Sequence, residues 1–191
     1  MPMPAADREK ARRWTANQVR QLITDSPLAT PRYELVDGEL LVTPSPVGQH
    51  QRAVALLLHA LLAYLEQYPV AAAFSSPSDV ELEHGTIVQP DVYVVPLHEA
   101  RRILNQSPVR ELLVAAEVIS PSSRRFDRGT KRLLYGRHVP EYWIVDLDAR
   151  TLEEYELVSG AYVNRGTVPF DQPFTPRLFP GLAIDLAALA T

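Results

Sequence analysis

The sequence predicts a mixed α/β domain in which a central β-sheet is flanked by helices. Short apolar runs typical of strands alternate along the chain with stretches of helical periodicity. A hydrophobic fraction of 46% in 191 residues is sufficient for a packed core. Two dipeptides, Asp37-Gly38 and Ser159-Gly160, separate apolar arms in the manner of tight turns. We therefore expect a single domain over 1–191, with a helical arm at 1–30 and a proline-rich arm at 168–191.

The N-terminal elements begin with a capping box. Thr15 and Gln18 have the spacing of this motif and predict a short helix that ends near Ile23. The apolar arms on either side of the first turn predict a hairpin over 33–42. A hairpin directly after a helix is thus the expected start of the folded region.

A long helix follows this hairpin. Ser45 is the expected N-cap, Pro46 is the expected first helical residue, and the helix should end near Gln67. Because it is apolar on nearly all sides, we expect it to be buried. Further strands are expected over 70–74, 79–83, 87–95, 111–119, 141–147, 151–157 and 161–165, and further helices over 97–105, 123–135 and 186–190.

The composition excludes several classes of function. The chain has no cysteine, which rules out disulfides, thiolate metal sites and cysteine nucleophiles and is consistent with a reducing cytoplasm. A net charge of −4 excludes a uniformly basic nucleic-acid binder, so such a partner would need a local patch. The longest near-apolar run, over 53–65, is shorter than the roughly 20 residues that cross a membrane, and we expect no membrane association.

Two carboxylates interrupt strands that otherwise look fully buried. Asp91 lies in IVQPDVYVV and Glu117 in ELLVAAEVIS. A buried acid can hold its proton, pair with a cation or bind a metal ion, and an acid at a strand end can instead meet solvent. Two acids on neighbouring strands would repel each other unless a divalent ion lay between them. Oxygen ligands without cysteine favour Mg²⁺ or Mn²⁺.

The segment after Glu117 is strongly cationic. Between residues 124 and 137 six Lys and Arg residues face one acid, Asp127. Asp127, Lys131 and Tyr135 recur at four-residue spacing and share one helix face. The segment is either an exposed helix with an ordinary ion pair or a cationic helix that could hold a phosphate backbone.

The order of these motifs resembles a bacterial family of restriction endonucleases in the PD-(D/E)XK nuclease superfamily. The resemblance covers about residues 32–165 and is carried by YELVDGELLVTPSP, VQPDVYVV, AAEVISPSSRRFDRGTKRLLY and VPEYWIVD. It implies a restriction-endonuclease-like core with Asp91 and Glu117 as metal ligands and catalytic residues. The superfamily usually places a lysine two residues after the second acid, where this chain has Ile119. The resemblance points instead to Lys131.

The resemblance also implies an accessory role for Glu39 and His50. Metal-assisted hydrolysis of DNA would use Mg²⁺ or Mn²⁺ to activate water, Lys131 to neutralise developing charge, and cations of the following helix to hold flanking phosphates. Those cations are Arg124, Arg125 and Arg128.

Three functions remain open at this point. The first is a divalent-metal-dependent DNA endonuclease, in which two copies of the chain would be needed for a double-strand cut. The second is a catalytically inactive nucleic-acid-binding protein on the same fold. The third is a structural protein, for example a dimer, in which the two acids would be paired with arginines. Cation binding and cleavage of DNA distinguish them.

Overall fold

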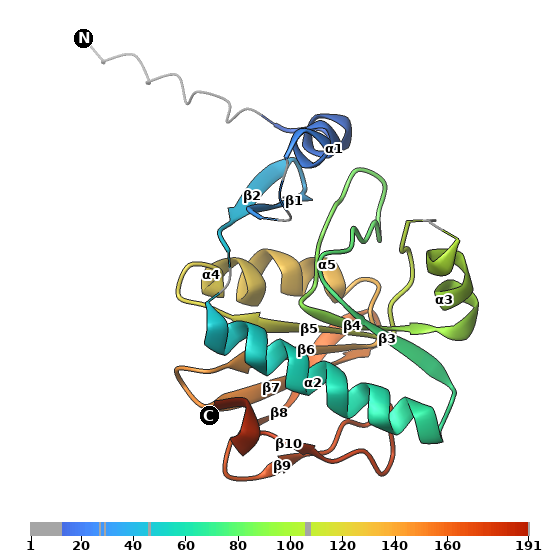
Figure 1. Cartoon of the computed structure of the whole chain (residues 1–191), viewed down its shortest axis with the longest axis vertical. Helices are drawn as coiled ribbons and strands as arrows, with labels where there is room; N and C mark the ends of the chain where they lie inside the picture. Colours follow the sequence, from blue (N-terminus) through green and yellow to red (C-terminus); the bar gives the residue numbers. More distant parts are fainter. Residues whose placement is uncertain (1–12, 27, 29, 46, 106–107, 191) are drawn as a thin grey trace.

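The centre of the structure is a six-stranded mixed β-sheet. The computed structural model describes residues 13–26, 28, 30–45, 47–105 and 108–190. Neighbouring strands of the sheet are antiparallel, except for one parallel pair in the middle formed by residues 114–119 and 141–146. In spatial order the strands are β3 (Ala71–Ser75), β4 (Val92–Pro96), β5 (Val114–Ile119), β6 (Glu141–Asp146), β7 (Thr151–Val158) and β8 (Ala161–Pro169) (Figure 1).

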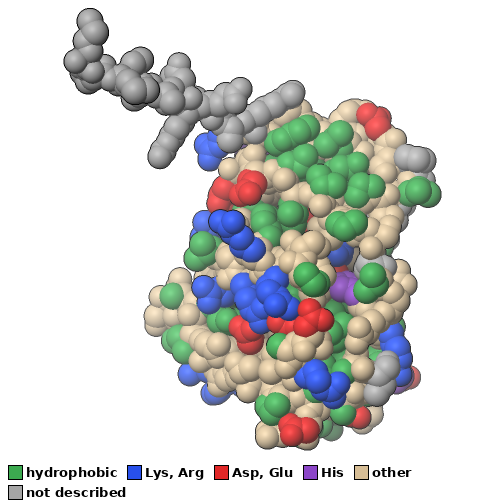
Figure 2. Space-filling view, turned by 90° about the vertical axis from the view of Figure 1, so that its left-hand side faces the viewer, with side chains coloured by type: hydrophobic (Ala, Val, Ile, Leu, Met, Phe, Trp, Pro, Cys, Tyr) green, Lys and Arg blue, Asp and Glu red, His purple; other side chains and the backbone are tan. Residues whose placement is uncertain are grey.

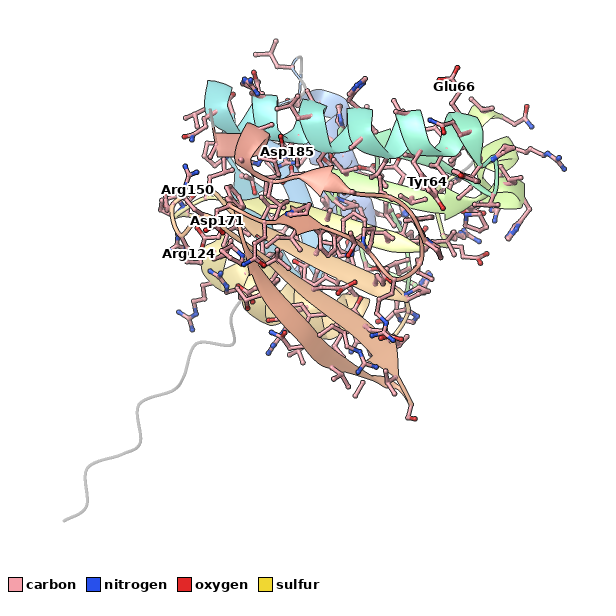
Figure 3. All side chains as sticks on the ribbon, turned by 90° about the horizontal axis from the view of Figure 1, so that it is seen from below. Tyr64, Glu66, Arg124, Arg150, Asp171 and Asp185 are labelled. Carbon is pink, nitrogen blue, oxygen red and sulfur yellow. The ribbon has the colours of Figure 1, made fainter. Side chains whose placement is uncertain are left out.

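Helix α2 (Gly48–Gln67) covers one face of this sheet. It packs there with the C-terminal arm, which forms the short strands β9 (Pro173–Phe174) and β10 (Ile184–Asp185) and a 3₁₀ turn at Ala187–Ala190. Figure 3 shows the end of β10, at Asp185, beside α2. The core on this side includes Leu57 and Trp143, both fully buried.

The other face is covered by α3 (Leu97–Leu104) and by one winding segment over 124–135. The latter consists of α4 (Arg124–Phe126), a π-helical turn (Asp127–Lys131) and α5 (Arg132–Tyr135). β5 is buried on both faces and is apolar except for Glu117, as its sequence predicted. β6 is also buried along its whole length, although it begins at Glu141 and ends at Asp146. The predicted α/β class is confirmed.

An N-terminal unit of one helix and one hairpin lies at one end of the molecule (Figure 1). Helix α1 (Ala16–Asp25) has the predicted capping box. The hairpin pairs β1 (Arg32–Val36) with β2 (Glu39–Thr43), and the two turn residues between them have φ values of 51° and 80°, as this tight turn requires. A bridge between Leu35 and Ile87 joins the hairpin to the body.

Some sequence-based expectations about individual elements were wrong. Residues 79–83 form no strand, because only Val80 finds bridging partners and the neighbouring backbone is held by turns and side chains. Ser45 does not cap α2 but donates a hydrogen bond to Thr30 Oγ1, and Val47 occupies the cap position. Pro46 lies outside the described residues. One side of α2 is open to solvent, where Leu62 is 47% exposed.

The expected strand over 87–95 and helix over 123–135 are both interrupted. The strand β4 starts at Val92, because Pro90 has no N–H group to offer a neighbouring strand. The helical segment contains the π turn in place of regular α-helix. Within the described ranges, no helix combines the length and apolar character needed to cross a membrane.

Candidate active site

The two predicted acids face each other across neighbouring strands. Val92 pairs with Ala116, which places Asp91 and Glu117 opposite one another at the next step of the antiparallel register. Their exposed fractions are 3% and 2%. Both border a cavity of about 300 Å³, which we call the acidic cavity. Its other charged lining residues are Arg32, Glu34, Asp127 and Lys131, and His50 also borders it.

Asp91 is held by three hydrogen-bond donors. Its Oδ1 accepts from Arg32 Nη1 at 2.7 Å, and its Oδ2 lies 3.1 Å from His50 Nε2 and 3.0 Å from the backbone nitrogen of Val118. Burial alone would raise the pKa of Asp91. The hydrogen bond from His50 and the charge of Arg32 outweigh it and lower this pKa to about 2. Asp91 is therefore an anion throughout the physiological pH range.

Glu117 is held from the other side of the cavity. Its Oε1 accepts hydrogen bonds from Lys131 Nζ at 2.9 Å and from the Tyr135 hydroxyl at 3.0 Å. Burial raises the pKa of Glu117 well above its ordinary value. Lys131 opposes this shift, while the negative charges of nearby acids add to it. The Glu117 carboxylate thus holds its proton more tightly than an exposed glutamate does.

Lys131 is shared by several carboxylates. Its Nζ lies 2.9 Å from Glu34 Oε1, 2.9 Å from Glu117 Oε1 and 3.4 Å from Asp127 Oδ1, and the residue is 2% exposed. Burial alone would lower the pKa of Lys131, but the surrounding acids raise it well above the ordinary value. The ammonium group is therefore permanently charged.

The interpretation of the 124–137 segment as an exposed helix is wrong for one of its faces, which is buried. Asp127, Lys131 and Tyr135 are all buried, and they point into the fold from the π turn and α5. A π turn contains one more residue than an α turn, and such turns are frequent at functional sites. Here it carries both Asp127 and Lys131 to the acidic cavity.

The acidic cavity fits a divalent cation by charge and donor type. Four carboxylates face two permanent cations, which leaves two negative charges when all the carboxylates are ionised and His50 is neutral. The Asp127 Oδ1 atom is buried without a hydrogen-bond partner among the described residues. Hard oxygen donors of this kind suit Mg²⁺ or Mn²⁺. In the present arrangement, no three acidic or histidine side chains of the described chain converge closely enough to form a complete metal site.

The structure does not bring every predicted residue to this cavity. Glu39 follows the hairpin turn, at the opposite end of the hairpin from Arg32, and it is exposed. Arg124 pairs with Asp146 and Asp148, and Arg128 pairs with Asp146 and Glu153. On the face of the molecule drawn in Figure 2, basic side chains lie next to acidic ones near the middle. Figure 3 shows Arg124 at the same end of the sheet as Arg150 and Asp171.

Four further residues of the site were not assigned to it from the sequence: Arg32, Glu34, Asp127 and Tyr135. Glu34 could have been found by the rule that singled out Asp91, because it is an acid between apolar residues of a strand. The shared helix face already grouped Asp127 and Tyr135 with Lys131. Nothing in the sequence around Arg32 distinguishes it from a surface arginine.

The six-stranded mixed sheet flanked by helices is the α/β arrangement expected for a restriction-endonuclease-like core. The sequence matches the Uma2 family, described as putative restriction endonuclease, over residues 17–187, and the chain belongs to this family. The fold is similar to the crystal structure of a putative nuclease belonging to DUF820 from Anabaena variabilis ATCC 29413. That similarity has a TM-score of 0.65 at 19% identity and covers 90% of this chain and 96% of the other. No curated protein matches the chain.

Membership of this family supports a nuclease, and therefore a hydrolase with a nucleic-acid substrate.

Proposed function

We propose that the protein is a divalent-metal-dependent endonuclease that hydrolyses phosphodiester bonds of DNA in the acidic cavity. The observation that carries the proposal is that four carboxylates and Lys131 line one cavity, whose charged groups sum to two negative charges when every carboxylate is ionised and His50 is neutral. A buried charge imbalance of this size is costly unless a cation offsets it. The family to which the chain belongs supports the same chemistry.

Asp91 and Glu117 are the residues that would hold Mg²⁺ or Mn²⁺. Bound there, the ion would supply an activated water and polarise the phosphoryl group. The remaining groups act around these ligands. Arg32 and His50 orient the Asp91 carboxylate, while Tyr135 and Lys131 orient that of Glu117. Lys131 is also the cation best placed to offset negative charge that develops on a phosphate in this cavity.

Plasmid cleavage tests the proposal. Purified protein with Mg²⁺ or Mn²⁺ is expected to nick plasmid DNA, and Asp91→Asn is expected to lower the rate by at least about a hundredfold, since metal assistance contributes several kcal/mol to the barrier. Glu39→Gln is the matched control, because it removes an exposed acid outside the cavity. Equal activity of Asp91→Asn and the unaltered protein would refute the assignment.

We assign the binding of flanking phosphates to Arg124, Arg125 and Arg128. Arg125 has no ion pair within the described chain, whereas the other two would exchange carboxylate partners for phosphates. Replacing Arg125 with alanine is expected to weaken DNA binding uniformly across sequences and to reduce the slope of log affinity against log salt by about 1. A slope identical to that of the unaltered protein would exclude this contact.

A nucleic-acid-binding protein without catalysis is the second candidate. It is favoured by the fact that both oxygens of Asp91 are already satisfied by Arg32, His50 and the Val118 backbone. Calorimetry with Mn²⁺ separates the two candidates. If the protein is an endonuclease, it binds Mn²⁺ and cleaves DNA, and Asp91→Asn abolishes both activities. Tight DNA binding with neither Mn²⁺ binding nor cleavage identifies the second candidate. We also expect the endonuclease to act in the cytoplasm and to make double-strand cuts only as a pair of copies.

A further inference from the structure

A second cavity, of about 390 Å³, adjoins the acidic cavity. The two cavities share Arg32, His50 and Asp91, so this hydrogen-bonded cluster lies between them. We call the second one the side cavity. A ligand whose charged part lies in the acidic cavity can therefore place a neighbouring group in the side cavity. The volume is in the range that accepts small organic groups.

The lining of the side cavity is chemically unlike that of the acidic cavity. One wall is the apolar side of α2, with Val54, Ala55 and Leu58, and Pro77 adds to it. Apart from the three shared residues, its lining carries no charge among the described residues. Such a site disfavours a phosphate and suits an uncharged group with apolar faces.

Polar atoms are nevertheless available for such a group. Ser75 and Gln51 border the side cavity, and neither side chain has a hydrogen bond within the described chain. Arg32 Nε and His50 Nδ1 are buried at the boundary of the two cavities without a hydrogen-bond partner among the described residues. Unpaired buried nitrogens are rare in native proteins and are commonly satisfied by a ligand or water.

We propose that the side cavity receives the nucleobase next to the phosphodiester that is hydrolysed. A nucleobase is uncharged, has two apolar faces and carries polar atoms only on its edge, which matches this lining. The base leaves its stack to enter, with its faces against α2 and Pro77 and its edge toward Ser75 and Gln51. The inference rests on the proposed function, because it assigns to the side cavity the base adjacent to the phosphodiester bond that is hydrolysed in the acidic cavity.

Two consequences follow from this assignment. Extracting a base from a duplex requires unstacking and unpairing, so single-stranded or mismatched DNA is cut faster than a perfect duplex. The identity of the base beside the cut also affects the rate, since neutral hydrogen-bonding groups border the cavity.

Filling the side cavity from α2 tests the proposal. Ala55 is exposed and borders the cavity, so Ala55→Phe adds bulk there without disturbing the core. Ala63→Phe is the matched control, because Ala63 is an exposed alanine of the same helix outside the side cavity. Circular dichroism and the denaturation midpoint establish that both variants are folded.

The substrate is a single-stranded oligonucleotide whose cut position has been mapped, together with a series in which each nucleotide near the cut is abasic in turn. Ala55→Phe is expected to cut the normal oligonucleotide at least about tenfold more slowly, as stacking energies of this kind imply. On the oligonucleotide that is abasic at one particular position, Ala55→Phe is expected to cut as fast as the unaltered protein. Ala63→Phe should match the unaltered protein on every substrate.

Two results would overturn the inference while leaving the endonuclease intact. One is that Ala55→Phe cuts all oligonucleotides as fast as the unaltered protein. The other is that it cuts all of them more slowly by the same factor, abasic ones included. Failure of the unaltered protein to cut either the oligonucleotides or plasmid DNA would instead refute the proposed function itself.

Discussion

Replacing Lys131 with methionine removes the ammonium group that Glu34, Glu117 and Asp127 share, while keeping a side chain of similar length. Removing one partner of a buried charge cluster costs about 3–5 kcal/mol, because the remaining charges stay in a poorly solvated place. In a chain of this length each kcal/mol lowers Tm by about 2–4 °C, so we expect a fall of about 6–20 °C. Urea and thermal denaturation in the presence of EDTA measure it without interference from bound cations.

Two further variants make this prediction specific. Arg101→Met removes an exposed cation of α3 and is expected to change the free energy of unfolding by less than about 0.5 kcal/mol. Combining Lys131→Met with Glu34→Gln removes one of the stranded charges, so the double variant should be at least about 1 kcal/mol more stable than the sum of the single changes implies. A loss below about 1 kcal/mol for Lys131→Met would refute the reasoning, because Lys131 would then not be neutralising buried acids.

Three other perturbations have definite expected outcomes. Burial raises the pKa of Glu141 to about 7 from 4.5, so the folded state binds this proton more tightly and stability falls as pH rises from about 4.5 through 7. The loss between pH 5 and pH 8 is about 2–3 kcal/mol, and Glu141→Gln should abolish it in urea titrations at these two pH values. Leu57→Ala leaves a cavity at a fully buried position of α2 and should lower the free energy of unfolding by about 2–5 kcal/mol, as measured by chemical denaturation. A smaller loss would mean that the surrounding core side chains move in to fill the cavity. Gly160→Ala, at a φ of 84° with open space around it, should cost about 1 kcal/mol by thermal denaturation, entirely through the backbone.

Local rules predicted much of the fold because they involve residues close in sequence. The capping box at Thr15 and the turn at Asp37 are set by interactions over two or three residues, and both were predicted. The segment at 79–83 shows the limit of this approach. Its alternation of polar and apolar residues is typical of a strand, but a strand also needs a partner with free backbone groups, which only the tertiary structure supplies.

The site residues also divide into those that could be recognised from the local sequence and those that could not. Asp91 and Glu117 were singled out because an acid among apolar strand residues is anomalous wherever the strand lies. Arg32 was missed because its partner, Asp91, is 59 residues away in the chain, and the sequence near Arg32 does not indicate that contact. Arg124 and Arg128 were recognised as cations, but their carboxylate partners on β6 and β7 and the turn between them become visible only once the sheet is assembled.

Arg32 and Glu34 in the lining of the acidic cavity belong to the β1–β2 hairpin. The other charged lining residues lie just before β4, in β5 and in the helical segment that follows β5, and they are Asp91, Glu117, Asp127 and Lys131. Local opening of the hairpin therefore withdraws one positive and one negative group together and leaves Asp91 and Lys131 each short of a partner. By thermodynamic reciprocity, a ligand that binds only the complete cavity makes that opening less favourable by the same free energy with which closure favours binding of the ligand. Amide hydrogen exchange in the hairpin is consequently a measure of occupancy that needs no catalytic turnover.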